Sequence, residues 1–250
     1  MNNYLLDKIR NLDSKTKVIT FVGGGGKTTS IYQIADALKS ESNILITTTT
    51  HMFHPHDKVD QVYFDDLPSK ITHPLIGLFS SYDQSKDKVK GLSKDRVNKI
   101  KASKVFDIIL NEGDGSKNRP LKSYGPGEPV IPTQSDMVVI VIGADVLGRP
   151  LSDQVVHRLE PFKRITGLND GETITYDAIL KLLTHHEGFL KDLPLTAQVY
   201  VLFNKTKTYP IDLVKISEKL FSLTSRYQAI LSAEMSTFEI IDFVEGKDND

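Results

Sequence analysis

Four consecutive glycines, Gly23–Gly26, constrain the fold of this chain more than any other feature of its sequence. A β-branched and aromatic run at residues 18–22 precedes them, and residues 28–39 follow with apolar side chains at helical spacing. Consecutive glycines cost backbone entropy, so they belong where the backbone must turn sharply or approach another group closely. Together with a further strand candidate at 43–47, this order predicts a βαβ unit with parallel strands.

The same glycines fit a phosphate-binding loop. The sequence satisfies the short pattern G-x-x-G-K-T, although the longer P-loop pattern would need a glycine where Phe21 stands. Lys27 would add a positive charge for the terminal phosphates, and the Thr28 hydroxyl would be a ligand for Mg²⁺. The alternative is a glycine hairpin beside an unrelated lysine, which the helix that follows disfavours. We therefore expect Mg²⁺ with ATP or GTP to bind at Gly23, Gly24, Gly25, Gly26, Lys27, Thr28 and Thr29.

Further apolar runs extend the βαβ unit into a larger sheet. The run MVVIVI at 137–142 is uninterrupted, as expected of a strand that is covered on both faces. The other strand candidates are 75–80, 105–110, 199–203 and 227–231, and the other helix candidates are 94–103 and 211–223. We predict an α/β fold with a doubly wound, mostly parallel sheet flanked by helices, similar to that of P-loop NTPases. We expect one domain over residues 1–250 and leave open a small helical insertion near 159–193.

A magnesium nucleotide site also needs a carboxylate beside the phosphate loop. Glu112 and Asp114 follow a strand candidate, so both are candidates for holding the metal and for a catalytic role beside Lys27. The alternative is that both are ordinary loop acids. Thr48 and Thr49 close another strand at the same edge of the sheet, and we expect their hydroxyls to contact a substrate. The alternative is that these β-branched residues only favour the strand.

Asn204 and Lys205 follow the strand candidate at 199–203, where GTPases read guanine with the pattern N-K-x-D. The last position of the pattern is Lys207 in this chain, and an ammonium group cannot accept hydrogen bonds from the N1 and N2 hydrogens of guanine. We expect Asn204 and Lys205 to bind the nucleotide, without predicting selectivity for guanine. A polar turn explains the two residues equally well.

Residues 113–134 contain four Gly and four Pro and little periodicity. Loops of this length without regular structure tend to be functional. We expect Arg119, Lys122, Glu128 and Arg158 to bind a small anionic substrate, and Lys122 to contribute to catalysis. The alternative is a set of surface ion pairs, each of which stabilises little.

Three histidines, His51, His54 and His56, lie within six residues of one another. Imidazoles so close together can bind Zn²⁺ or Ni²⁺, but loop histidines without a ligand are the commoner case. Whether they bind a metal stays open.

Composition excludes several kinds of chemistry and partner. The chain has no cysteine, which excludes disulfides, thiolate metal sites and covalent catalysis by a thiol. Its net charge of -1 gives no field that would attract nucleic acid or an anionic membrane. It has no run of 18 apolar residues, and residues 1–17 lack a signal-peptide core. We expect a cytoplasmic protein without nucleic-acid or membrane partners, and predict no oligomeric state.

Four blocks of the sequence resemble the YqeC family, which is associated with selenium-dependent molybdenum hydroxylases. They are FVGGGGKTT at 21–29, TTTT at 47–50, EGDGS at 112–116 with RPLK and EPVIP after it, and GADVLGRPL at 143–151 with VHR at 156–158. The resemblance implies a nucleotide-binding accessory protein of selenium cofactor biosynthesis, with phosphoryl or nucleotidyl chemistry on a small anionic substrate. A molybdenum hydroxylase or a cofactor-synthesis protein is the implied partner. The alternatives are a nucleotide-driven switch or chaperone that delivers a cofactor, and a non-catalytic module that binds a phosphate-bearing cofactor.

Overall fold

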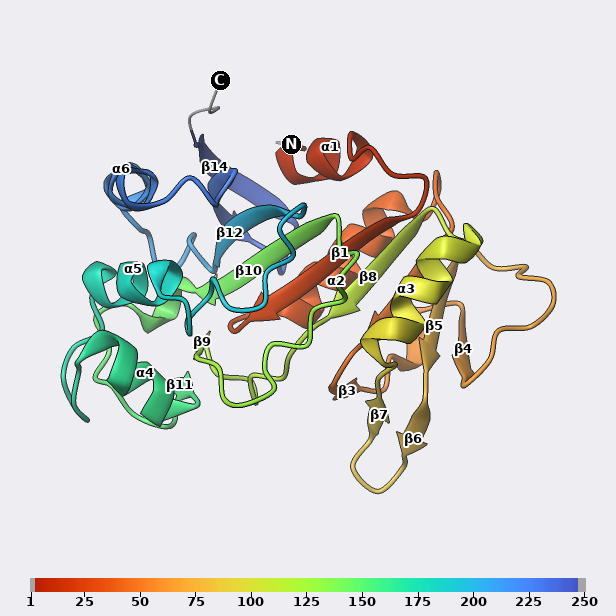
Figure 1. Ribbon diagram of the computed structural model, residues 1–250, viewed down its shortest axis with the longest axis horizontal. Coiled ribbons are helices and arrows are strands. Elements are labelled where there is room, and N and C mark those ends of the chain that lie inside the picture. Colours follow the sequence, from red (N-terminus) through yellow and green to blue (C-terminus); the bar gives the residue numbers. More distant parts are fainter. Residues whose placement is uncertain (1–2, 247–250) are drawn as a thin grey trace.

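A nine-stranded sheet forms the centre of the protein, whose computed structural model describes residues 3–246. Its strands are β1 (Lys17–Gly23), β2 (Ile44–Thr48), β4 (Gln61–Phe64), β5 (Leu75–Phe79), β8 (Ile108–Glu112), β10 (Met137–Gly143), β12 (Gln198–Asn204), β13 (Ala229–Glu234) and β14 (Glu239–Glu245). They lie in the order β14-β13-β12-β10-β1-β8-β2-β5-β4, which places β1 in the middle (Figure 1). Neighbouring strands are parallel except for β13 and β14. The predicted α/β fold with a mostly parallel sheet is therefore confirmed.

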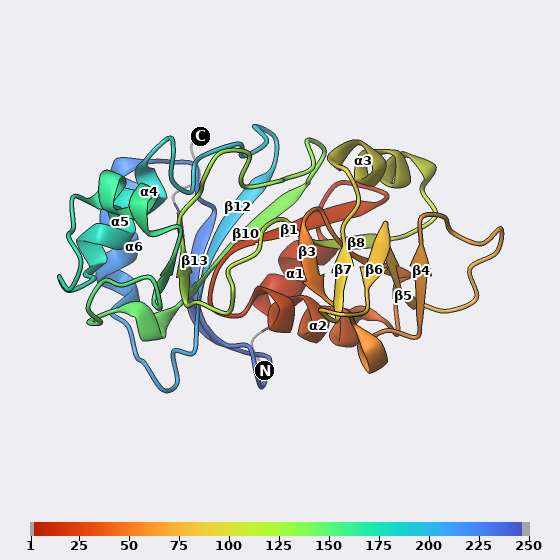
Figure 2. The ribbon, with the colours of Figure 1, turned by 90° about the horizontal axis from the view of Figure 1, so that it is seen from below.

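Helices cover both faces of this sheet (Figure 2). One face carries α1 (Tyr4–Arg10) and α2 (Lys27–Leu38), and the other carries α3 (Lys94–Ser103), α4 (Leu159–Thr166), α5 (Tyr176–Thr184) and α6 (Leu213–Leu223). Among residues 3–246, none of the helices has the length and apolar character that a membrane span requires.

The buried strands supply apolar side chains to both layers because successive residues of a strand point to opposite faces. In β1, Ile19 and Phe21 pack against α1 and α2, whereas Val18 packs against α3 on the other face. A fully buried side chain of this kind stabilises the fold by about 1.5–3 kcal/mol. These two apolar layers fix β1 in the sheet and so fix the position of the glycines at its carboxyl end.

Two small sheets were not expected from the sequence. A pair of two-residue strands, β9 (Leu121–Lys122) and β11 (Val156–His157), sets Lys122 opposite His157. The other sheet contains β3 (His51–Phe53), β7 (Lys88–Lys90) and β6 (Ser81–Asp83), in the order β3-β7-β6. The segment 113–134, which the sequence analysis left without regular structure, therefore contains β9.

Two other expectations differ in detail from the structure. The strand expected at 105–110 lies at 108–112, because α3 ends in a left-handed residue, Lys104, and pairing with β1 begins at Ile108. Asn111 and Glu112 therefore belong to the strand and are buried. The region 159–193 contains α4 and α5, whose buried side chains share one apolar cluster with β10 and β12.

Candidate functional site

The glycine turn at the end of β1 packs tightly against neighbouring backbone. Gly23, Gly25 and Gly26 have φ values of +97°, +78° and +132°, which residues with a side chain rarely adopt. A Cβ atom on Gly25 would lie 2.3 Å from the backbone nitrogen of Gly143, and one on Gly24 would lie 2.7 Å from the carbonyl oxygen of Arg119. Glycine is therefore required here both by backbone conformation and by close approach.

The amide groups that remain free belong to the end of this turn and to the first turn of α2. The N–H groups of Gly23 and Gly24 donate within the protein, to Asp114 and Val141, and that of Gly25 donates to Arg119. Within the described part of the chain, the N–H groups of the next four residues have no hydrogen-bond partner: Gly26, Lys27, Thr28 and Thr29. Four free N–H groups at a helix N-terminus form an anion-binding site.

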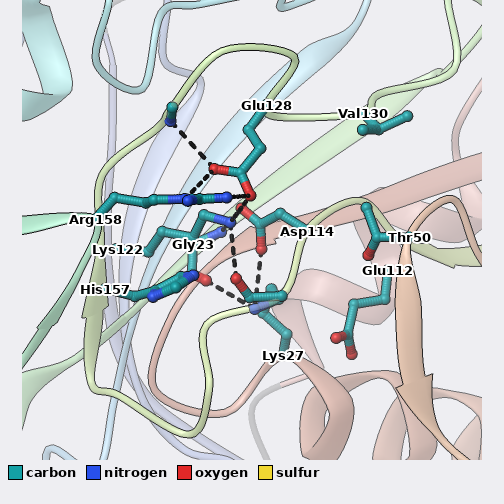
Figure 3. Close-up of polar contacts among 12 residues, drawn as sticks. Gly23, Lys27, Thr50, Glu112, Asp114, Lys122, Glu128, Val130, His157 and Arg158 are labelled. Carbon is teal, nitrogen blue, oxygen red and sulfur yellow. Dashed lines mark hydrogen bonds and ion pairs between the residues drawn. The ribbon is translucent and has the colours of Figure 1, made fainter. Parts of the chain in front are cut away.

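Lys27 is buried beneath this turn and bound to a carboxylate. Its Nζ donates to the carbonyl oxygen of Gly23 at 2.7 Å and lies 3.0 Å from Asp114 Oδ1. The other oxygen of Asp114 accepts from the N–H group of Gly23 at 2.9 Å (Figure 3). Asp114 has no exposed surface, so its carboxylate holds Lys27 and the first glycine rather than facing solvent.

Thr28 and Glu112 place two oxygen ligands side by side. The Thr28 hydroxyl donates to Glu112 Oε2 at 2.6 Å, and both residues line the same pocket. Burial raises the pKa of Glu112 above its usual value, against the opposing effects of the Lys27 charge and the Thr28 hydrogen bond. Hydroxyl and carboxylate oxygens are the ligands that Mg²⁺ prefers, so this pair fits the predicted metal.

Lys122, Glu128 and Arg158 continue the chain of charges that begins at Lys27. Lys122 is fully buried, and its Nζ donates to the carbonyl oxygen of Gly115 at 2.7 Å and to Glu128 at 3.0 Å. Arg158 donates to both oxygens of Glu128 (Figure 3). Burial raises the pKa of Glu128, but the Arg158 hydrogen bonds and the Lys122 charge together outweigh it and lower the pKa to about 2. Glu128 is therefore ionised at neutral pH.

His157 is a pocket residue that the predicted site lacks. Its Nδ1 lies 3.1 Å from Arg119 Nη1 and must accept that hydrogen bond, because a guanidinium group has no acceptor. Burial, followed by the charges of Lys122 and Arg158, lowers the pKa of His157 to about 4. The imidazole is therefore neutral at pH 7 and carries its proton on Nε2. The position of His157 beside Arg158 in the VHR block was the available signal.

Asn204, at the end of β12, links the glycine turn to the residue that follows β13. Its side-chain Nδ2 donates to the carbonyl oxygen of Gly25 at 2.8 Å, and its Oδ1 accepts from the N–H groups of Lys205 and Met235, each at 2.8 Å. Asn204 is 4% exposed, and the three partners of its side-chain amide are all backbone groups. Lys205 Nζ lies 2.9 Å from Asp145.

These elements surround one cavity of about 760 Å³, within the usual range for sites that bind small molecules and cofactors. Its floor is the segment 25–29 with Glu112, and one wall is the β3–β7 sheet with His51, Phe53 and Lys88. Further lining residues are Thr50, Met52, Gly115, Ser116, Lys117, Asn118, Glu128, His157, Asn204, Lys205, Glu234 and Ser236.

Several predicted site residues do not line the cavity. Each of three is instead hydrogen-bonded to a residue that does line it. Arg119 bonds to His157, and Lys122 and Arg158 bond to Glu128. The hydroxyls of two other predicted residues bind backbone carbonyl groups: Thr48 donates to Glu112, and Thr49 to Val130.

The three clustered histidines do not converge on one point. His51 lines the cavity, whereas His56 Nε2 lies 2.9 Å from Asp87. His54 packs against the rings of His56 and Tyr82.

Replacing Asn204 with alanine should destabilise the protein by about 1–3 kcal/mol, because it leaves the buried Met235 N–H group without its acceptor. It should also weaken anion binding at the first turn of α2, because Gly25 loses the hydrogen bond that fixes it. Urea unfolding and titration with inorganic triphosphate measure the two effects. Unchanged stability in the variant would contradict the bridging role.

Comparisons with known proteins place the chain in a family. The family model described as "YqeC protein" matches residues 19–160, which contain the glycine turn, Glu112, Asp114 and the β9–β11 pair. The chain is also 36% identical over 182 residues to a protein of Escherichia coli (strain K12) described as "Uncharacterized protein YqeC", covering 71% of each chain. The chain belongs to the YqeC family.

Proposed function

We propose that this protein binds a magnesium nucleoside triphosphate at the first turn of α2 and transfers a phosphoryl or nucleotidyl group to a small anionic substrate. The observation that supports this most is the meeting of four free N–H groups, Lys27, and the Thr28–Glu112 oxygen pair in one cavity. Free amides and an ammonium group bind phosphates. A hydroxyl beside a carboxylate holds Mg²⁺, which partly neutralises the phosphates when it is bound.

Under this proposal, one part of the cavity binds the nucleotide and the neighbouring part binds the second substrate. The amides of 26–29 and Lys27 bind and orient the polyphosphate. The second substrate lies beside Glu128 and His157, where the Nε2–H group of neutral His157 donates to an anionic oxygen. Lys122 and Arg158 hold Glu128 ionised and in place from behind. Asp114 holds Lys27 until the phosphates engage it.

The biological role that we propose is in selenium cofactor biosynthesis and the maturation of selenium-dependent molybdenum hydroxylases, as the family resemblance implies. The absence of cysteine adds one chemical condition to that role. A selenium species cannot be carried on a side chain of this protein as a perselenide, so it enters the site free or bound to a partner. The second substrate is then a small selenium-containing or oxygen-containing anion.

Calorimetric titration tests nucleotide binding. We expect uptake of ATP or GTP in the presence of Mg²⁺ and weaker uptake with a chelator present. Substituting Thr28→Val should reduce the gain in affinity due to Mg²⁺ by about tenfold, because it removes one ligand oxygen while the backbone amide stays. No uptake at millimolar concentrations of either nucleotide with Mg²⁺ would overturn the proposed function.

Product analysis separates group transfer from the alternatives. Phosphoryl transfer predicts release of the nucleoside diphosphate, and nucleotidyl transfer predicts release of pyrophosphate; either release should rise when a selenium donor is added as the acceptor. A switch or chaperone predicts slow release of phosphate by hydrolysis, and it predicts that the protein captures a hydroxylase only when nucleotide is bound. A non-catalytic module predicts binding without release.

A further inference from the structure

We propose that the nucleotide is a guanine nucleotide, and that Glu234, at the end of β13, reads the base. The inference rests on the proposed function, because it needs a nucleotide in the cavity. It also revises what the sequence indicates, since the guanine-reading position of N-K-x-D is occupied here by Lys207. Lys207 is ion-paired with Glu239. The acceptor comes instead from the neighbouring strand.

The hydrogen bonds of Asn204 fix Glu234 relative to the phosphate-binding turn. Strands β12 and β13 are parallel neighbours, with Asn204 opposite Ala233. Asn204 donates to Gly25 with one side-chain atom and accepts from Met235, the residue after Glu234, with the other. Gln33, one turn along α2 from Thr29, donates to the carbonyl oxygen of Ser236 at 3.1 Å. The turn at 234–236 is therefore held on both sides at a set distance from the helix N-terminus.

The carboxylate of Glu234 lacks a cation. In the described residues 3–246 it forms no ion pair, and its side chain accepts one hydrogen bond, from the Ser236 hydroxyl to Oε1 at 2.6 Å. It lines the cavity on the side of Asn204 and Lys205. An ionised carboxylate repels phosphates unless a cation lies between them, as Mg²⁺ would beside Glu112. Glu234 has no cation beside it among the described residues, so it suits a neutral part of the ligand that offers N–H groups. The base is that part.

Lys205 is suited to cover the base rather than to bind phosphate. Its backbone takes the left-handed conformation, with φ of +69°, directly after the bridging residue Asn204. Its Nζ lies 2.9 Å from Asp145, which neutralises the ammonium group. The aliphatic part of a lysine held in this way offers apolar surface. A flat ring between this surface and the 234–236 turn would have its edge toward Glu234.

The donor pattern of the base then selects guanine. Guanine presents two adjacent N–H donors, N1–H and N2–H, on one edge, and a carboxylate with two oxygens accepts both. Adenine presents one N–H group beside the lone pair of N1, which faces a carboxylate unfavourably. A bidentate contact of this kind typically discriminates between bases by tenfold or more. We therefore expect GTP to bind at least about tenfold more tightly than ATP.

The test compares the affinities of GTP, ATP and XTP, each with Mg²⁺, for the wild type and for Glu234→Gln. The carboxamide keeps one acceptor for N1–H and turns a donor toward position 2, which carries an oxygen in xanthine and an amino group in guanine. The variant should lose about tenfold in GTP affinity, gain in XTP affinity and leave ATP affinity unchanged. The matched control is Glu239→Gln, which removes a glutamate paired with Lys207 outside the cavity and should change none of the three.

The outcomes separate this inference from the proposed function. Equal affinities of wild type for ATP and GTP, or an unchanged GTP affinity in Glu234→Gln, would overturn the reading by Glu234 and leave nucleotide binding intact. Absence of binding by all three nucleotides in the wild type would overturn the proposed function and this inference together. Unchanged ATP affinity in the variant also shows that it is folded.

Discussion

Replacing Lys27 with methionine should lower nucleotide turnover by a factor on the order of 10²–10³, the usual cost of removing one pre-positioned donor from developing negative charge. The methionine keeps the length of the side chain and removes its charge. Single-turnover assays with the preferred nucleotide measure the loss. A variant with wild-type turnover would show that the phosphates react elsewhere.

The same substitution should destabilise the protein, since it takes the cation from a carboxylate without exposed surface. Asp114 would retain only the Gly23 N–H group and the more distant Lys122 at 4.0 Å. Removing one partner of a buried ion pair costs about 3–5 kcal/mol. Substituting Asp114→Asn in addition removes the unpaired charge, so the double variant should regain stability but not turnover. Recovery of turnover in the double variant would mean that the ammonium group of Lys27 acts only on folding.

The central part of the fold is predictable because its signals are local. The strands β10 and β12 are continuous apolar runs, and both are buried along almost their whole length. The apolar run of β1 before the glycines and the helical spacing of α2 after them predict a strand, a turn and a helix. This order places Lys27 and Thr28 at the start of the helix. The sequence offered Glu112 and Asp114 alike as acidic partners of this site, and only the parallel pairing of β1 with β8 shows that Glu112 is the one that contacts Thr28.

The rest of the site depends on pairings between segments distant in the sequence. The strands β3, β6 and β7 have three residues each, too few to show an alternating pattern, so the wall that carries Phe53 was not predicted. The position of Lys122 behind Glu128, instead of in the cavity, depends on the β9–β11 register. Glu234 is one acidic residue after one strand, and only the β12–β13 pairing brings it beside Asn204.

Substituting Glu128→Gln should destabilise the protein by about 3 kcal/mol at pH 7, because it leaves the fully buried ammonium group of Lys122 without its closest counter-charge. Urea unfolding measures the difference from wild type. The control is Glu187→Gln, which breaks a surface pair with Arg164 and should cost less than about 1 kcal/mol.

The difference in free energy of unfolding between wild type and Glu128→Gln should depend on pH, with a sign that the pKa of Glu128 determines. The pKa of Glu128 is lowered from 4.5 to about 2 in the folded protein, so the unfolded chain binds more protons between these values. The stabilisation by the Glu128 carboxylate is complete above the unfolded pKa and is lost as the pH falls toward the folded one. Wild type and Glu128→Gln should therefore converge in stability as the pH falls from about 5 toward 2. A gap that stays constant over this range would mean that Glu128 acts through its shape alone.

A variant that lacks the charges of both Lys122 and Glu128 distinguishes the effect of an unpaired charge on stability from the effect of altered packing. In the double variant Lys122→Met and Glu128→Gln, no buried ammonium group remains without a partner. Its loss of stability should therefore be smaller than the sum of the two single losses, with an interaction energy of about 1–3 kcal/mol. Arg158 and Asp114 stay in place in the double variant, so this energy belongs to the Lys122–Glu128 contact. If the losses simply add, the two groups are stabilised independently, and the chain of charges from Lys27 to Arg158 does not act as a unit.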